Sequence, residues 1–465
     1  MKLSMNKRRV DATEGPLFSK MVIFAVPLML TSLLQQLYSM ADNIVVGQFS
    51  GDPNALGAVG SCSAFVAMLN AIFIGFSAGS GALCSQAFGA KDNEALSRTT
   101  HTALVFGLIA GTAAGTIGIT FARPILIALD TKSEILDLAV AYISIIAAGM
   151  PGHAVYNVGA SVLRSTGDSK TPLYTLTATG ILNVVLNLFT VVVLKLSVAG
   201  VAIATAVSHY ASAIIVLYVL SKRRTEPYAL SVSKLRIDVS VLKRLLRLGI
   251  PASIQSSLFS FTNMFLIKAL NTFPTPVVSA RTIATNIDVL LSTAINTYLH
   301  TSMTFTGQNY GAKKPERIKK SLLYSLLQVI VLGLGVGQLM LLFYEPLVGL
   351  YVAADNPYRA EIFEAAKVIM TVMLSSYFIG AMNEALSGFL RGLGQSIQPM
   401  VATLSSVVVF RCFWIFVVFP YTKTLVSLYL VYPLSWILNC LALGIMCTLA
   451  WKKKVKPLSA KSEKL

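Results

Sequence analysis

The sequence predicts an all-α polytopic membrane protein whose twelve transmembrane helices form two six-helix bundles. Only 12% of its 465 residues are charged, against about 25% in soluble domains, and the mean hydropathy is +0.70. Long apolar runs recur along the whole chain, and roughly 20 residues suffice to cross a ~30 Å hydrocarbon core as a helix. These observations exclude a water-soluble enzyme.

Apolar runs between charged segments predict the membrane spans in order. We expect them near residues 21–45, 56–79, 102–122, 138–160, 172–194, 198–220, 248–270, 283–305, 322–343, 367–389, 400–420 and 425–450. Continuous runs of this length favour helices over barrel strands of about 10 alternating residues. The first run follows a basic start, but from Met21 to Val46 it is too long for a signal peptide and lacks a cleavage site.

Positive charge is concentrated between the spans. The formal net charge is +18, and with the N-terminus inside, 29 of the 38 Lys and Arg residues fall in cytoplasmic segments. This distribution is the positive-inside pattern and does not indicate a nucleic-acid-binding patch. We therefore expect a monomeric multi-pass protein of the plasma (inner) membrane, surrounded by lipids, with both termini in the cytoplasm and no nucleic-acid partner.

Three motifs recur in order in the two halves of the chain. They are Gln86–Lys91 with Gln308–Lys313 (shift 222), Leu163–Asp168 with Leu390–Gln395 (shift 227), and Pro27 with Pro251 (shift 224). Such ordered recurrence predicts a duplication. The glycines of these loops are expected to supply the backbone conformations of tight turns.

The duplication predicts the domain organisation. We expect a first lobe at 1–220, a basic connector at 221–247, a second lobe at 248–451 and a basic tail at 452–465. Because each half has an even number of spans, the pseudo-twofold axis should run along the membrane normal. Transporters that rock two bundles around a central site have this parallel-repeat plan.

These residues resemble the multidrug and toxic compound extrusion (MATE) family over almost the whole chain, from about Leu17 to Trp451. The most specific motifs are Ser-Met-Ala-Asp ending at Asp42 and followed by Val46-Gly47, the Gln-x-x-Gly-Ala-Lys loops, and Leu-Arg-x-x-Gly after spans 4 and 10. The resemblance implies a secondary antiporter. It would export cationic or amphipathic compounds by alternating access, in exchange for H⁺ or Na⁺.

Asp42, near the outer end of span 1, is the first candidate for cation coupling. It matches the first-span acid that the resemblance implies for this role, and a carboxylate at membrane depth is usually paired or functional. In span 5, Asn183 and Asn187 lie one turn apart on one helix face, at the depth of Asp42. Many prokaryotic relatives have an aspartate at the position of Asn187, so Asp42 is the only titratable acid expected there. Alternatively, Asp42 is an interfacial acid and the asparagines join helices.

A second acidic group is predicted in the other half of the chain. Asp288 in span 8 and Glu384 in span 10 suggest a second-lobe cavity. Arg411 in span 11 could neutralise either acid, because buried charges are normally paired, and an acid paired in this way would be structural.

Further polar residues within spans are candidates for lining a substrate site. They are Gln35, Gln36, Tyr38, Asn70, Gln255 and Asn263. For each of them, hydrogen bonding between helices is the competing interpretation.

Other functions receive less support from the sequence. The four histidines lack metal-ligand spacing and no Walker loop is present, so we expect no metal, no cofactor and no direct use of ATP. A lipid-linked oligosaccharide flippase of the same superfamily is the main alternative, although it should have a more cationic cavity. A membrane enzyme would need a clustered nucleophile or base, and an ion channel would more naturally be an oligomer with a repeated filter sequence.

Overall fold

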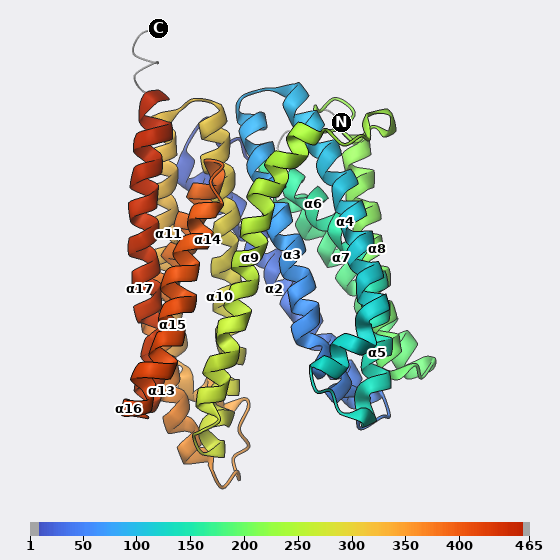
Figure 1. Ribbon diagram of the computed structural model, residues 1–465, viewed down its shortest axis with the longest axis vertical. Coiled ribbons are helices and arrows are strands. Elements are labelled where there is room, and N and C mark those ends of the chain that lie inside the picture. Colours follow the sequence, from blue (N-terminus) through green and yellow to red (C-terminus); the bar gives the residue numbers. More distant parts are fainter. Residues whose placement is uncertain (1–8, 459–465) are drawn as a thin grey trace. The chain divides into compact units, whose positions relative to one another are not determined.

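The protein is described here by a computed structural model that covers residues 9–458, without the side chains of residues 64, 259–261 and 264 (Figure 1). The described residues are helical and include no strand. The longer helices are α2 (Leu17–Phe49), α3 (Ala55–Gly89), α4 (Asn93–Ala128), α5 (Ser133–Ala148), α6 (Met150–Ser165), α7 (Lys170–Asn187), α8 (Ser197–Lys222), α9 (Val239–Leu270), α10 (Thr275–Gly311), α11 (Pro315–Leu342), α13 (Arg359–Gly392) and α17 (Leu425–Ala450). Shorter segments are η2 (Leu188–Val193), η3 (Val232–Lys234), α12 (Tyr344–Gly349), α14 (Ile397–Thr403), η4 (Leu404–Val409), α15 (Phe410–Phe413), η5 (Trp414–Val418), α16 (Phe419–Thr422) and η6 (Trp451–Val455). The all-α prediction is confirmed for these residues.

The apolar helices are long enough to cross a bilayer. Among the described residues, nine helical segments pass a test of length and hydropathy, and the bent pair α5 and α6 makes a tenth. Helices α9 and α10 contain 32 and 37 residues but are more polar. Together these segments follow the order of the twelve predicted spans.

Two spans differ from the continuous helices that the sequence predicts. The span expected at 138–160 is bent by 43° between α5 and α6, where Gly149 packs against Ala206 and Pro151 lacks a backbone donor. The span expected at 400–420 alternates α and π segments from α14 to α16, and this part lies beside α17 (Figure 1). The hydropathy profile gives the length of an apolar run but does not distinguish a straight α-helix from one that bends or contains π turns. Neither irregularity could therefore be predicted from it.

The chain forms two compact units. The first unit comprises Met1–Asp11 and Val26–Ser253, and the second comprises Ala12–Ala25 and Ile254–Leu465. The divisions therefore fall inside α2 and α9, close to Pro27 and Pro251. Each proline removes one backbone donor from its helix, so each division lies near a weak point in the helical hydrogen bonding.

The repeated loops adopt the same backbone geometry in both units. Three backbone hydrogen bonds recur with equal N···O distances. The Ala90 N–H donates to the Gln86 carbonyl at 2.9 Å, as Ala312 does to Gln308. The other two pairs are Lys91 to Phe88 with Lys313 to Tyr310, at 3.1 Å, and Asp92 to Ala87 with Lys314 to Asn309, at 3.0 Å. Helices α3 and α10 therefore both end in a turn that is closed by a hydrogen bond between residues five apart, as is typical of a Schellman motif. This agreement supports the duplication inferred from the sequence.

The role predicted for the glycines is confirmed in only one pair of loops. Gly167 and Gly394 have φ values of +88° and +73°, and a Cβ on Gly167 would lie 2.2 Å from the Val10 carbonyl oxygen. In the Gly-Ala-Lys loops, however, Lys91 and Lys313 take the left-handed conformation, both with φ of +54°. The prediction was wrong there because the left-handed position comes two residues after the glycine.

A buried ion pair supports the Gly167 turn of the first unit. Asp168 is fully buried and binds the guanidinium of Arg223, which is 8% exposed. Asp168 also accepts hydrogen bonds from the backbone N–H (2.9 Å) and hydroxyl (2.6 Å) of Thr171. Arg223 in turn donates to the Tyr228 hydroxyl at 3.0 Å. These contacts join the end of α8 to the start of α7.

Asp238 caps the N-terminus of α9, and this cap should depend on pH. Its carboxylate accepts from the Ser240 hydroxyl at 2.6 Å and from the Val241 backbone at 3.1 Å, and these bonds, with Arg98 nearby, lower its pKa. The folded pKa then lies below the unfolded value of about 3.9. The carboxylate therefore stabilises the cap above about pH 3.9, and this stabilisation is lost as the pH falls through the folded pKa.

Hydrogen exchange at the Ser240 and Val241 amides, corrected for intrinsic rates, checks this expectation. Protection should be constant above about pH 5 and should decrease as the pH falls through about 3.9 toward the lower folded pKa of Asp238. In Asp238→Asn the uncharged side chain still caps the helix, so protection there should be independent of pH. The same decrease in both proteins would show that Asp238 does not cause it.

Candidate functional site

Asp42, Asn183 and Asn187 meet in the first unit, on helices α2 and α7. The Asn187 amide donates to Asp42 Oδ1 and, at 3.2 Å, to Asn183 Oδ1. Thr205 on α8 completes the group, because its hydroxyl lies 3.5 Å from both Asp42 Oδ2 and Asn183 Nδ2. We call these four residues the Asp42 cluster. The structure thus brings together the three residues that the sequence selects here.

The Asp42 cluster is half-buried and contains one polar atom without a partner. Asp42 is partly exposed, whereas Asn183 and Asn187 are buried. The Asn187 Oδ1 atom is buried and has no hydrogen-bond partner among the described residues. A carboxylate, an amide oxygen and a hydroxyl are all oxygen ligands suited to a hard cation, and the carboxylate can also accept a proton.

The helix that carries the asparagines changes its winding at the cluster. Helix α7 ends at Asn187, and the π segment η2 begins at the next residue. In η2 the Thr190 hydroxyl donates to the Leu186 carbonyl at 2.8 Å and to the Gly200 carbonyl at 3.0 Å. Single π turns inside α-helices often occur at functional sites. Here the wider turn lies directly beside the polar group.

The duplication does not reproduce this carboxylate in the second unit. With the shift of 224 that relates the prolines of α2 and α9, Asp42 corresponds to Leu266, which is buried. The two units therefore carry different chemistry in corresponding helices.

Asp288 lies among aromatic residues in the second unit. On α10 it hydrogen-bonds Tyr377 of α13, while its Oδ1 atom is buried and has no partner among the described residues. The Tyr377 and Trp436 rings are 5.4 Å apart, and Trp436 lies 5.8 Å from Tyr432. Tyr429 stacks on Tyr432 at 6.0 Å. We call these residues the Asp288 cluster.

Arg411 is not paired with the acids that the sequence suggests for it. Its Nε donates to the Ser435 hydroxyl at 3.0 Å, and its guanidinium lies 4.4 Å from the centre of the Tyr432 ring. No ion pair of Arg411 with Asp288 or Glu384 is found in the described part of the chain. The pairing that the sequence left open is therefore not found there, and an aromatic face and a hydroxyl accommodate this cation instead.

Arg391 is the arginine that interacts electrostatically with Glu384. It is 4% exposed and donates to Gln255 Oε1 at 2.7 Å, while Gln255 donates to Thr403 at 2.9 Å. The sequence places Arg391 in a turn motif, and this interaction with Glu384 was not predicted. Its spacing of seven residues from Glu384, about two helical turns, was the available signal.

Among the other residues predicted to line a substrate site, some contact neighbouring helices and others are exposed or half-buried. Tyr38 lies against Gly180, where a Cβ would come within 1.9 Å of the ring, and its hydroxyl is 3.4 Å from the Thr177 carbonyl. Asn263 lies 3.5 Å from the Tyr432 hydroxyl. Gln35 is exposed, whereas Gln36 and Asn70 are half-buried.

Two polar residues of these sites were not predicted from the sequence. Thr205 and Tyr377 contact Asp42 and Asp288 respectively. Neither a threonine nor a tyrosine within a membrane span is unusual, so composition gave no signal. Among the described residues there is also no group of three or more His, Cys, Asp and Glu side chains arranged to hold a metal ion.

Two repeated units of membrane-spanning helices, each with a partly buried polar group, define the protein as a multi-pass α-helical membrane protein with the architecture of a transporter. Comparison with known proteins specifies the family. The MatE family model matches residues 27–189 and 251–417, one stretch in each half. The chain belongs to the MatE family.

Individual relatives agree with this assignment. The chain is 28% identical over 447 residues to the probable multidrug resistance protein YoeA of Bacillus subtilis, covering 93% of this chain and 94% of that protein. It is 26% identical over 427 residues to the probable multidrug resistance protein NorM of Thermotoga maritima, covering 88% and 87%. The crystal structure of MATE in complex with MaD3S has the same fold, with a TM-score of 0.86 over 97% of this chain and 99% of that one at 22% identity. The predicted twelve-helix fold is thereby confirmed.

Proposed function

We propose that the protein is a secondary antiporter that exports cationic or amphipathic compounds in exchange for H⁺ or Na⁺. The observation that carries the proposal is the Asp42 cluster, which surrounds one carboxylate with amide and hydroxyl groups. The relatives named as multidrug resistance proteins support the substrate class. No cofactor is required by this chemistry.

Ion binding would change the hydrogen bonds of the Asp42 cluster. Ionised Asp42 accepts from the Asn187 amide and faces the Thr205 hydroxyl. A protonated Asp42 becomes a donor and needs an acceptor, which the Thr205 oxygen or the unpartnered Asn187 Oδ1 can supply. A bound Na⁺ would use the same oxygens. Either ion therefore favours a rearranged cluster.

Rearrangement of the cluster can reach the helices that carry it. Asp42 lies on α2, which contains Pro27, and Asn187 lies at the start of the π segment η2. Both features weaken regular helical hydrogen bonding and permit bending. In this proposal, ion binding favours one conformation of the first unit, by the difference in ion affinity between the two conformations.

The Asp288 cluster is our candidate for contact with a cationic substrate. Aromatic faces attract organic cations, and an adjacent carboxylate supplies a full negative charge. Tyr432 already binds one cation in this way, the guanidinium of Arg411. An incoming cation can compete for that ring while it approaches Asp288.

Transport by the purified protein tests the proposal. In proteoliposomes, ethidium should move against its gradient only when an H⁺ or a Na⁺ gradient is imposed, and the two gradients should be imposed separately. Lipid vesicles without protein provide the baseline. Uphill movement with neither gradient, or translocation of an anionic lipid-linked precursor in place of ethidium, would contradict the antiporter and favour the flippase.

A further inference from the structure

Five exposed lysines lie at one end of the second unit. Lys319 and Lys320 belong to the first turns of α11, and Lys452, Lys453 and Lys456 follow α17 in and after η6. We call them the terminal lysine cluster. They are remote in the sequence from the Asp42 cluster and have no part in the transport chemistry proposed above.

Apolar packing holds the two groups of lysines on neighbouring helix ends. Val455 and Ile318 are both fully buried in one hydrophobic core together with Leu393. Lys454 is directed inward, where its Nζ donates to the Leu393 carbonyl at 2.7 Å. The π winding of η6 thus buries Val455 and turns Lys454 inward, while Lys452, Lys453 and Lys456 stay exposed. The basic residues occupy an ordered helical surface.

Within the described part of the chain, none of these lysines has a carboxylate partner within 4 Å, whereas Arg98 in the first unit has two. Lys320 corresponds to Arg98 with a shift of 222, and Arg98 pairs with Glu94 and Asp238 at 3.7 and 3.5 Å. Every ion pair found within 4 Å among the described residues belongs to the first unit. Glu316 is the single acid in the first turn of α11, and it is exposed.

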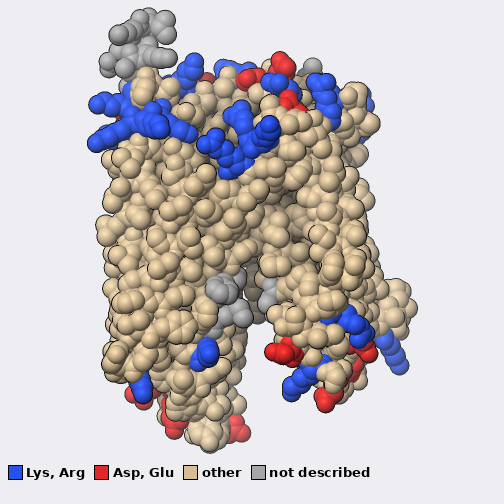
Figure 2. Space-filling model, in the orientation of Figure 1, with Lys and Arg blue, Asp and Glu red and all other residues tan. Residues whose placement is uncertain are grey.

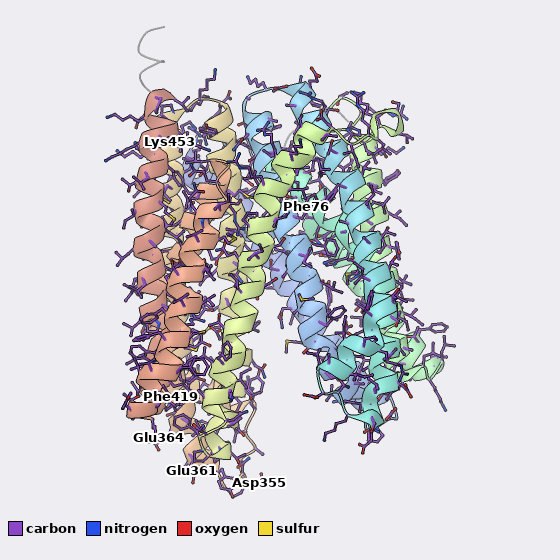
Figure 3. All side chains as sticks on the ribbon, in the orientation of Figure 1. Phe76, Asp355, Glu361, Glu364, Phe419 and Lys453 are labelled. Carbon is purple, nitrogen blue, oxygen red and sulfur yellow. The ribbon has the colours of Figure 1, made fainter. Side chains whose placement is uncertain are left out.

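The opposite end of the same unit carries acidic residues. Figure 3 shows Lys453 at one end of the unit and Asp355, Glu361 and Glu364 at the other. Figure 2 shows Lys and Arg side chains gathered around the end of α17. Trp451 is half-buried at the junction of α17 and η6, and Trp is a typical residue of the membrane–water interface. The lysines therefore lie at headgroup level.

We propose that the terminal lysine cluster is a binding site for the phosphate group of an anionic phospholipid. The five lysines lie on two neighbouring helix ends beside the interfacial Trp451, and none of them forms an ion pair within 4 Å with a carboxylate of the described residues. Lysine binds phosphate as a point charge, and juxtamembrane groups of lysines attract anionic lipids. The acyl chains would lie along the exposed apolar faces of α11 and α17, which include Leu323, Leu327 and Leu449.

Native mass spectrometry of the full-length protein in detergent tests this site. The protein is titrated with equimolar phosphatidylglycerol and phosphatidylcholine, and bound lipids are counted. Wild type should prefer phosphatidylglycerol. Lys319→Gln/Lys320→Gln and Lys452→Gln/Lys453→Gln should each weaken phosphatidylglycerol binding by about 30-fold and leave phosphatidylcholine binding unchanged.

Matched variants separate a site from a general charge effect. Lys132→Gln/Lys268→Gln removes two lysines elsewhere and should leave binding as in wild type, and Lys452→Arg/Lys453→Arg should retain it. Equal affinity of wild type for both lipids, or equal losses in the cluster and control variants, would overturn the proposal. Displacement of phosphatidylglycerol by millimolar glycerol phosphate would also contradict it, because the ligand would then be a soluble phosphate. Melting temperatures verify that each variant is folded.

Discussion

Asp42→Asn should reduce ion-driven efflux by about two orders of magnitude while the protein still folds and binds substrate. Asparagine nearly preserves the shape of the side chain but removes its charge and its titration. An ion with no differential affinity for two conformations cannot shift their populations, and a shift from 1:99 to 99:1 needs a differential affinity of about 10⁴. Loss of this carboxylate should therefore uncouple transport from the gradient. Ethidium uptake under separate H⁺ and Na⁺ gradients measures the effect.

Asp52→Asn is the matched control, because Asp52 lies in the loop after α2, where it accepts from the Asn54 backbone at 2.8 Å. This variant should transport like wild type. If Asp42→Asn also retains ion-driven transport, Asp42 is an interfacial acid and the proposed coupling site is wrong. The same substitution at Asp288 and Glu384→Gln would then show whether a second-unit acid couples the ion.

Arg223→Gln should destabilise the first unit by about 3–5 kcal/mol, because it leaves Asp168 charged, buried and without its ionic partner. Asp168 is fully buried and keeps only the Thr171 hydrogen bonds in this variant. For a unit of this size, the apparent melting temperature should fall by about 10 °C. Thermal unfolding in detergent, followed by size-exclusion chromatography, measures the change.

A second substitution distinguishes the unpaired charge from lost packing. Asp168→Asn/Arg223→Gln removes both charges, so it should recover much of the stability lost in Arg223→Gln. The neighbouring Arg224 is exposed, and Arg224→Gln should leave the melting temperature unchanged. A double variant as unstable as Arg223→Gln would indicate that the ion pair is not the cause.

The fold was largely predictable because the bilayer imposes one strong requirement on the sequence. Backbone groups in hydrocarbon must be hydrogen-bonded within the segment, so long apolar runs become helices. The order of the helices and the duplication follow from the same runs and from the recurring motifs at Gln86–Lys91 and Gln308–Lys313. Resemblance to a known family added the expected function, which composition did not contain.

Part of the candidate site was also predictable. Helical periodicity places Asn183 and Asn187 on one face, and counting residues places Asn187 at the depth of Asp42. The hydrogen bond between Asn187 and Asp42 agrees with both estimates. The functional roles of these residues stay predictions, which ion-driven transport by Asp42→Asn tests.

The sequence by itself determined the membrane class, the helix order and the repeats, because these depend on hydropathy and local spacing. Only the tertiary structure decided which side chains meet. Arg411 is placed on Tyr432 and Arg391 near Glu384, although either arginine could neutralise an acid on composition alone. The tertiary structure also decided the local backbone conformation, such as the left-handed Lys91 and the π turn of η2. Partners of buried charges depend on helix packing across long sequence separations, and no local pattern encodes that packing.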